Sequence, residues 1–89
     1  MKKQVYSVYV LLLENGNYYI GHTNNLNRRM QEHREGRSPY TRRNPLKFLL
    51  YSEKFSTRSE AVCRERFLKS GKGREWLRKK LAEQSASGG

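Results

Sequence analysis

The stretch VYSVYVLLLENGNYYIG, residues 5–21, decides the fold of this chain. Its first part, residues 5–13, is rich in β-branched and aromatic side chains, which is typical of a strand. Residues 14–17, Glu-Asn-Gly-Asn, predict a turn, because Asn and Gly adopt positive φ angles with little strain. Residues 18–21 predict a returning strand, so the whole stretch predicts an antiparallel β-hairpin.

The length of the hairpin loop decides whether its two inner tyrosines can act together. A two-residue loop at residues 15–16 puts Tyr9 and Tyr19 on opposite faces, because side chains alternate along a strand. A three-residue loop that ends on Gly16 pairs Tyr9 with Gly21 and brings both phenols to one face. Phenols can donate protons, orient a water or act as weak bases, so a function that uses both predicts the three-residue loop. Tyrosines are also common in half-buried strands, and the pair alone carries little weight.

Outward from the hairpin, the sequence predicts one further strand and three helices. These are a helix over residues 25–35 that Gly36 ends, a strand over residues 46–51, a helix over residues 57–69 opened by a Thr57–Glu60 capping box, and a helix over residues 74–83. Residues 37–44 predict a basic loop, and Gly71 and Gly73 are expected to separate the last two helices. The third strand is apolar enough to be central. The order β-β-α-β-α-α predicts an α/β (α+β) fold, a small three-stranded sheet packed with three helices.

The composition bounds the class of protein. The 89 residues are 35% hydrophobic, enough for one modest core, and we expect a single domain over residues 1–83 with a flexible tail over residues 84–89. The longest apolar run, Val8–Leu13, is far short of a membrane span, and residues 1–4 do not predict a signal peptide. A single cysteine, Cys63, excludes an intramolecular disulfide framework and a zinc site of several thiolates. We expect a soluble cytoplasmic domain in which Cys63 is a packed thiol.

The charge favours a polyanionic partner. The chain has 19 Lys and Arg against 8 Asp and Glu, a net charge of +11, and two segments, residues 28–43 and 64–80, hold most of the excess. Such a charge attracts phosphate backbones, so nucleic acid is expected ahead of mere solubility and ahead of an anionic membrane surface. The residues expected to grip the backbone, with little base specificity, are Arg42, Arg43, Lys69, Lys72 and Arg74.

Two side chains of the first predicted helix suit phosphate chemistry. Arg29 and His33 are four residues apart and project from one helix face. A guanidinium can grip phosphate oxygens, and an imidazole can move a proton near neutral pH. The neighbouring Arg28 carries the same charge but points about 100° away around the helix. A solvated basic face is the commoner meaning of such a pair.

Glu65 is the most informative single residue. On a helical wheel it falls inside the apolar arc of Ala61, Val62 and Leu68, where a carboxylate costs free energy unless it is paired or binds a metal ion. Both a buried pair with a neighbouring Arg and a ligand for Mg²⁺ remain open. His22 is expected to lie in a loop or at a rim, because no second His or Cys stands at ligand spacing.

Taken together, these pieces resemble the GIY-YIG nuclease family. The first motif stands as Ser7-Val8-Tyr9, with Ser and Val in place of Gly and Ile, and the second is intact as Tyr19-Ile20-Gly21. Residues 25–30, Asn-Leu-Asn-Arg-Arg-Met, are similar to the family's segment that singles out Arg29, and His33 and Glu65 match two further positions. The resemblance runs from about Val5 to Leu81 and is closest to small standalone bacterial members, which are similar to the N-terminal nuclease module of the bacterial excinuclease.

The resemblance implies a metal-dependent endonuclease that hydrolyses DNA phosphodiester bonds with little intrinsic sequence specificity. One Mg²⁺ or Mn²⁺ ion would bind to Glu65, and Tyr9 would accept a proton from the attacking water or orient it. Tyr19 and His33 would hydrogen-bond around the nucleophile and phosphate, and Arg29 would stabilise charge in the transition state. The alternatives are a non-catalytic nucleic-acid-binding module and a nuclease subunit that depends on a protein partner for specificity.

Overall fold

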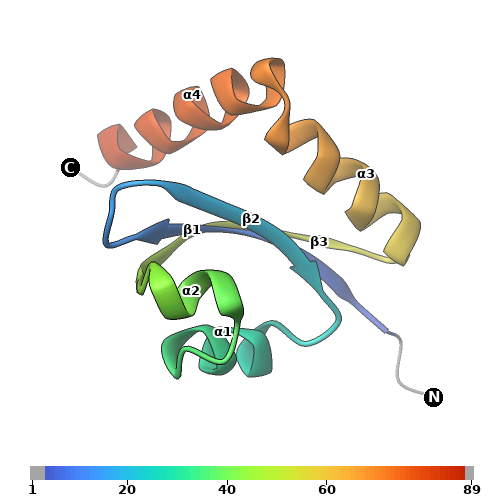
Figure 1. Cartoon of the computed structure of the whole chain (residues 1–89). Coiled ribbons are helices and arrows are strands. Elements are labelled where there is room, and N and C mark those ends of the chain that lie inside the picture. The colour runs from blue at the N-terminus through green and yellow to red at the C-terminus, as the bar shows by residue number, and fades with distance from the viewer. Residues whose placement is uncertain (1–3, 88–89) are drawn as a thin grey trace.

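The protein, described by a computed structural model over residues 4–87, has one three-stranded sheet with helices on both faces (Figure 1). Along the chain the elements are β1 (Tyr6–Leu13), β2 (Tyr18–Thr23), α1 (Leu26–Arg34), α2 (Pro39–Arg43), β3 (Leu46–Phe55), α3 (Arg58–Lys69) and α4 (Gly71–Ser87). Helices α1 and α2 cover one face of the sheet, and α3 and α4 lie over the other (Figure 1). The predicted α+β class and element order are confirmed, with α2 as an additional short helix where the sequence predicts a loop.

The hairpin has the three-residue loop. The N–H of Leu13 donates to the carbonyl of Asn17 at 3.0 Å, and Gly16 has a φ of +86°, which favours glycine. Tyr9 therefore pairs with Gly21, Leu11 pairs with Tyr19, and the predicted register is confirmed. Both inner phenols lie on the face that α1 and α2 cover.

The central strand is β1, not β3. The strand order is β2-β1-β3, so the prediction that residues 46–51 form a central strand is wrong. The reason lies in the continuous apolar run Val8–Leu13 of β1, which is typical of a strand covered on both faces. Strand β3 lies at one edge and exposes Phe48 and Leu49, and strand β2 forms the other edge.

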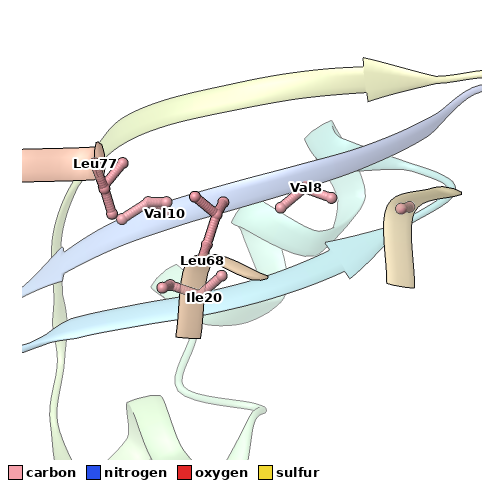
Figure 2. Close-up of a cluster of buried hydrophobic side chains, with 6 residues drawn as sticks. Val8, Val10, Ile20, Leu68 and Leu77 are labelled. Atoms are coloured by element: carbon pink, nitrogen blue, oxygen red, sulfur yellow. The ribbon is translucent and has the colours of Figure 1, made fainter. Parts of the chain in front are cut away.

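One core lies between the sheet and the α3–α4 pair. Val8, Val10 and Ile20 from the sheet pack against Leu68 of α3 and Leu77 of α4 (Figure 2). Burial of each such side chain contributes about 1.5–3 kcal/mol. This core fixes α3, and with it Glu65, against the sheet.

The junction between α3 and α4 differs from the expected glycine break. Helix α4 begins at Gly71, three residues before the predicted start, and Gly73 lies in its first turn. A Cβ at Gly73 would overlap the carbonyl oxygen of Phe67, so the glycine lets the two helices meet closely. The hydroxyl of Ser70 accepts the Gly73 N–H at 3.1 Å and caps the new helix.

The second core lies between the sheet and α1. It contains Tyr9, Leu11 and Leu13 of β1 with Met30 of α1. Helix α1 begins where the side chain of Asn25 accepts the Arg28 N–H, and the chain leaves it through Gly36, whose φ is +70°.

The two ends of the chain concern the predicted flexible tail and the expected lack of a signal peptide. Helix α4 continues through Ser87, into the segment 84–89 that is predicted to be a flexible tail. Gly88, Gly89 and residues 1–3 lie outside the described residues, so the tail and the expected lack of a signal peptide stay predictions. Within residues 4–87, none of the helices is both long and apolar enough to cross a membrane.

Candidate active site

The phenol of Tyr9 is the centre of the candidate site. It leaves the central strand on the α1 face and is only 1% exposed. Its partner across the strands is Gly21, and a Cβ at that position would lie 2.6 Å from the Tyr9 hydroxyl oxygen. Only a glycine there lets the phenol lie across β2, which is the edge strand. Burial raises the pKa of Tyr9, and this effect outweighs the hydrogen bond from Arg29, so the phenol is neutral near pH 7.

His33 of α1 is an acceptor for the Tyr9 proton. Its Nε2 lies 3.0 Å from the Tyr9 hydroxyl, and its Nδ1 lies 3.1 Å from the Thr41 hydroxyl of α2. The Thr41 hydroxyl donates to the Ser38 carbonyl, so its oxygen accepts from Nδ1–H. This assigns the proton of neutral His33 to Nδ1 and leaves Nε2 to accept from Tyr9. Burial, together with the charge of Arg29, lowers the pKa of His33 and favours this neutral form.

Arg29, and not Arg28, reaches this pair. The Nε of Arg29 donates to the Tyr9 hydroxyl at 3.4 Å, and its Nη1 donates to Glu32 at 3.1 Å. These two contacts hold the guanidinium half-buried beside the phenol and raise its pKa further above its usual value. The side chain of Arg28 is 76% exposed and lies 3.7 Å from Glu32. The helix face that singles out Arg29 in the sequence is the face that meets the sheet.

Tyr19 belongs to the same aromatic cluster. Its ring is stacked on that of Tyr9 at 6.3 Å between centroids and lies edge-on to His33 at 5.2 Å. On its outer side it contacts the ring of Tyr40 at 5.2 Å. The structure therefore brings the four predicted residues of the hairpin and first helix together at one place: Tyr9, Tyr19, Arg29 and His33.

Glu65 approaches the edge of β2 from the other side of the sheet. Its carboxylate is 18% exposed and accepts from His22 Nδ1 at 2.7 Å and from Lys69 Nζ at 2.9 Å. Burial alone would raise the pKa of the carboxyl, but the hydrogen bonds from Lys69 and His22 outweigh burial and lower it. Glu65 is therefore ionised, and its charge is one cause of the raised pKa of Tyr9, so the two groups act on each other across β2.

Two expectations about Glu65 and Cys63 are wrong, and the one about His22 holds in part. Glu65 is paired, but its partners are His22 and Lys69 rather than an arginine. His22, expected in a loop or at a rim, is not in a loop, because β2 continues to Thr23; it lies half-buried at the end of that strand, in contact with Glu65 of α3, so the rim alternative holds. Cys63 is exposed rather than packed, because it lies on the outer face of α3.

A polar hollow opens beside these groups at the end of β2. Its lining runs from His22 to Asn25 and continues along α1 with Arg28, Arg29 and Glu32. Two arginines and a histidine at one wall can contact the oxygens of a phosphate group. Arg29 lies at the boundary between this hollow and the Tyr9–His33 pair.

The donor set is compatible with one hard divalent cation. Among residues 4–87, no group of three or more His, Cys, Asp and Glu side chains is placed to hold a metal ion. An ionised Glu65 carboxylate can bind a Mg²⁺-type ion whose other ligands are waters and substrate oxygens. The Lys69 ammonium already occupies a cation position on that carboxylate. The residues therefore fit a metal ion of which Glu65 would be one ligand, with waters and phosphate oxygens as the others.

The residues expected to grip the backbone lie in three places. Arg42 and Arg43 are exposed on α2 and line a hollow with Arg37 and Pro39. Lys72 and Arg74 are exposed in the first turn of α4. Lys69 lies apart from both groups, in contact with Glu65.

Thr41 and Tyr40 of α2 are site residues that the sequence analysis missed, because it predicts a loop there. The Ser38-Pro39 pair is the signal that could have found this helix, since Ser is favoured before the first turn and Pro within it.

Taken together, a neutral phenol–imidazole pair, a fixed guanidinium and a nearby ionised carboxylate form a site suited to attack on a phosphate ester. Comparison with known proteins identifies the class. The family model of the GIY-YIG catalytic domain matches residues 5–80. The chain belongs to the GIY-YIG nuclease family.

Its similar relatives are small bacterial proteins of the UPF0213 group. A UPF0213 protein of Limosilactobacillus reuteri is 38% identical over 73 residues, which cover 78% of this chain and 75% of the relative. A UPF0213 protein of Streptococcus pneumoniae is 42% identical over 67 residues, which cover 73% of this chain and 67% of the relative. The solution NMR structure of a UPF0213 protein from Bacillus halodurans matches with a TM-score of 0.52 and 32% identity, covering 82% of this chain and 81% of that one.

Proposed function

We propose that this protein is a divalent-metal-dependent endonuclease that hydrolyses DNA phosphodiester bonds with little intrinsic sequence specificity. The observation that carries the proposal is the buried contact between the Tyr9 hydroxyl and Nε2 of His33, with Arg29 at its side. A domain that only bound nucleic acid would have no use for a neutral proton acceptor held in contact with a phenol that a fixed guanidinium also contacts. The compartment we propose is the cytoplasm, where a lone exposed thiol stays reduced.

Proton transfer from the attacking water follows from the tautomer of His33. The water oxygen bonds to phosphorus while its proton passes to the Tyr9 oxygen and the Tyr9 proton passes to His33 Nε2. The bond to the leaving oxygen breaks, and that oxygen takes a proton from solvent. Tyr9 stays uncharged throughout, which is consistent with its raised pKa.

Charge on the phosphate is balanced by the chain and by the bound ion. Arg29 is held by Tyr9 and Glu32, so its guanidinium is pre-oriented towards the hollow and needs little reorganisation. Such a fixed donor contributes about 3–4 kcal/mol to transition-state stability. Glu65 would hold one Mg²⁺ or Mn²⁺ ion, which supplies Lewis-acid stabilisation of the phosphate oxygens when bound.

The test is cleavage of labelled duplex, branched and single-stranded DNA by purified protein with Mg²⁺, with Mn²⁺ and with chelator. Glu65→Gln is compared with Glu75→Gln, which removes the same charge from an exposed position of α4. We expect metal-dependent cutting that Glu65→Gln abolishes and Glu75→Gln retains. Salt-sensitive binding without cutting, unchanged in Glu65→Gln, would contradict the proposal and indicate a binding module or a subunit that needs its partner.

A further inference from the structure

A further hollow, distinct from the one at the end of β2 and from the one on α2, lies between the hairpin and α4. Its walls are Tyr18 of β2, Tyr40 of α2, and Arg74 and Arg78 of α4, with the hairpin loop at one end. We call it the tyrosine–arginine hollow. Nothing in the hydrolysis chemistry uses these side chains.

The two arginines of this hollow form an unbalanced positive pair. Arg74 and Arg78 are four residues apart on α4, are exposed, and line one wall together. Neither has an acidic partner within ion-pair distance among residues 4–87. Two like charges at this spacing repel, so a bound anion would stabilise the wall.

The two tyrosines provide exposed aromatic surface next to that charge. Tyr18 is 44% exposed and Tyr40 is 43% exposed. Tyr40 also contacts Tyr19, whose other side stacks on Tyr9. A continuous series of rings therefore leads from the buried phenol of the candidate site to the hollow, from Tyr9 to Tyr19 at 6.3 Å and from Tyr19 to Tyr40 at 5.2 Å between centroids.

We propose that the tyrosine–arginine hollow binds an unpaired nucleotide next to the scissile phosphate. Its base stacks on Tyr40 and Tyr18, and its phosphate contacts Arg74 and Arg78. This inference rests on the proposed function. A base inside a duplex already stacks on its neighbours, so only an unpaired or extruded base can offer its face to these rings. The site therefore favours DNA that has an unpaired nucleotide beside the cut.

The experiment is a scan of abasic residues through a fluorescent single-stranded oligonucleotide, with affinity measured by anisotropy in chelator. The cut position is mapped beforehand with metal. Wild-type protein should bind about tenfold more weakly when the missing base is the one next to the cut, because stacking on a tyrosine is lost. In Tyr40→Leu this penalty should shrink to about twofold or less, and in Tyr40→Phe it should remain.

Two variants that remove the same charge test the proposed contact between the phosphate and the arginines. Arg78→Gln should weaken oligonucleotide binding more than Lys79→Gln, which removes the same charge from the next residue of α4. Tyr18→Leu gives a second aromatic test, because among residues 4–87 the Tyr18 ring makes no ring contact with a candidate catalytic residue. An equal penalty at every abasic position, unchanged in Tyr40→Leu and Tyr18→Leu, would overturn the proposal. Failure of the proposed function appears separately, as the absence of Glu65-dependent cleavage on any DNA.

Discussion

Gly21 leaves the space that the Tyr9 phenol occupies, and this makes it the most restrictive residue of the site after the reacting groups. A methyl group there would lie 2.6 Å from the hydroxyl oxygen and 2.8 Å from the ring carbon that carries it. The phenol would have to move away from His33 and Arg29. The glycine is needed for the position of a neighbour's side chain rather than for its own backbone.

Gly21→Ala should therefore damage catalysis more than folding. We expect cleavage to fall about 100-fold, because a displacement of about 1 Å at a reacting group costs that much. Gly71→Ala is the control, since a Cβ there meets nothing within 4 Å. Cleavage rates and thermal melts of both variants make the measurement; equal rates for wild type and Gly21→Ala would remove Tyr9 from the mechanism.

Protonation of His33 should reduce both stability and activity. Its pKa is lowered by burial, so below the ordinary value of about 6.5 the unfolded chain binds a proton that the folded chain resists. The contribution to stability is thus complete above about pH 6.5 and is lost as the pH falls towards the lowered pKa. Protonated Nε2 also cannot accept from Tyr9, so cleavage should fall over the same range.

Urea denaturation between pH 7.5 and pH 5 measures this effect. The pH dependence should be smaller in His33→Gln than in wild type, because the substituted side chain does not titrate. The carboxylates that also titrate in this range are the same in wild type and His33→Gln, so they do not contribute to the difference between the two pH dependences. An identical pH dependence in both would mean that folding does not shift the pKa of His33.

At the scale of elements, the sequence predicts the features that nearby residues determine, such as turns and helix ends. It does not predict the features that depend on how helices and strands pack against one another. The hairpin register follows from Gly16 and the loop length, and α1 follows from Asn25 and Gly36. The order of the strands does not follow from local sequence. Both β1 and the start of β3 are apolar, and only the packing of the helices decides which of the two is central and covered on both faces. His22 is missed for a similar reason, since its partner Glu65 is 43 residues away and on the other face of the sheet.

The candidate site shows the same division. Spacing along α1 separates Arg29 from Arg28, and the apolar arc of α3 marks Glu65 as unusual. The identity of the partners of Glu65 needs the packing of α3 on β2. The tautomer of His33 follows from its contact with Thr41, which lies on the five-residue helix α2. The sequence predicts a loop there, because the segment is short and basic.

Helix α3 places Lys69 one turn after Glu65, and the ammonium should compete with a metal ion for that carboxylate. The contact is 2.9 Å and Lys69 is half-exposed, so the pair contributes about 0.3–0.5 kcal/mol. Lys69→Met should therefore tighten Mn²⁺ binding about twofold or more. Lys72→Met is the control, because it removes the same charge from α4.

Titration of Mn²⁺ by electron paramagnetic resonance, without DNA, makes this measurement. Glu65→Gln should abolish the binding and remove any difference between the two lysine variants. If Lys69→Met and Lys72→Met bind Mn²⁺ equally, Lys69 does not compete for the site, and its contact with Glu65 is only structural.

At the scale of the whole molecule, we expect the charge to set the affinity for nucleic acid and the candidate site to set the chemistry. A net charge of +11 on 89 residues leaves an excess of basic groups that the acidic side chains cannot neutralise, even where each one is paired. The basic surface lies on both sides of β2, on α2 and on the start of α4. DNA held by both regions would pass over the edge strand β2, with Tyr9 and Arg29 in contact on one face of the sheet and Glu65 approaching from the other.

The salt dependence of binding tests this arrangement. Arg42 and Arg43 are exposed on α2, and replacing both with Gln should weaken DNA binding and reduce the slope of log affinity against log salt by about 1.4–1.8, the value for two phosphate contacts. Lys54→Gln with Arg58→Gln removes the same charge from a hollow at the N-terminal end of α3 and should change the slope less. Anisotropy titrations in chelator between 50 and 200 mM salt, about the range over which such slopes are resolved, separate the two. If both double variants change the slope equally, the charge acts as a diffuse field and α2 makes no contact of its own with the backbone.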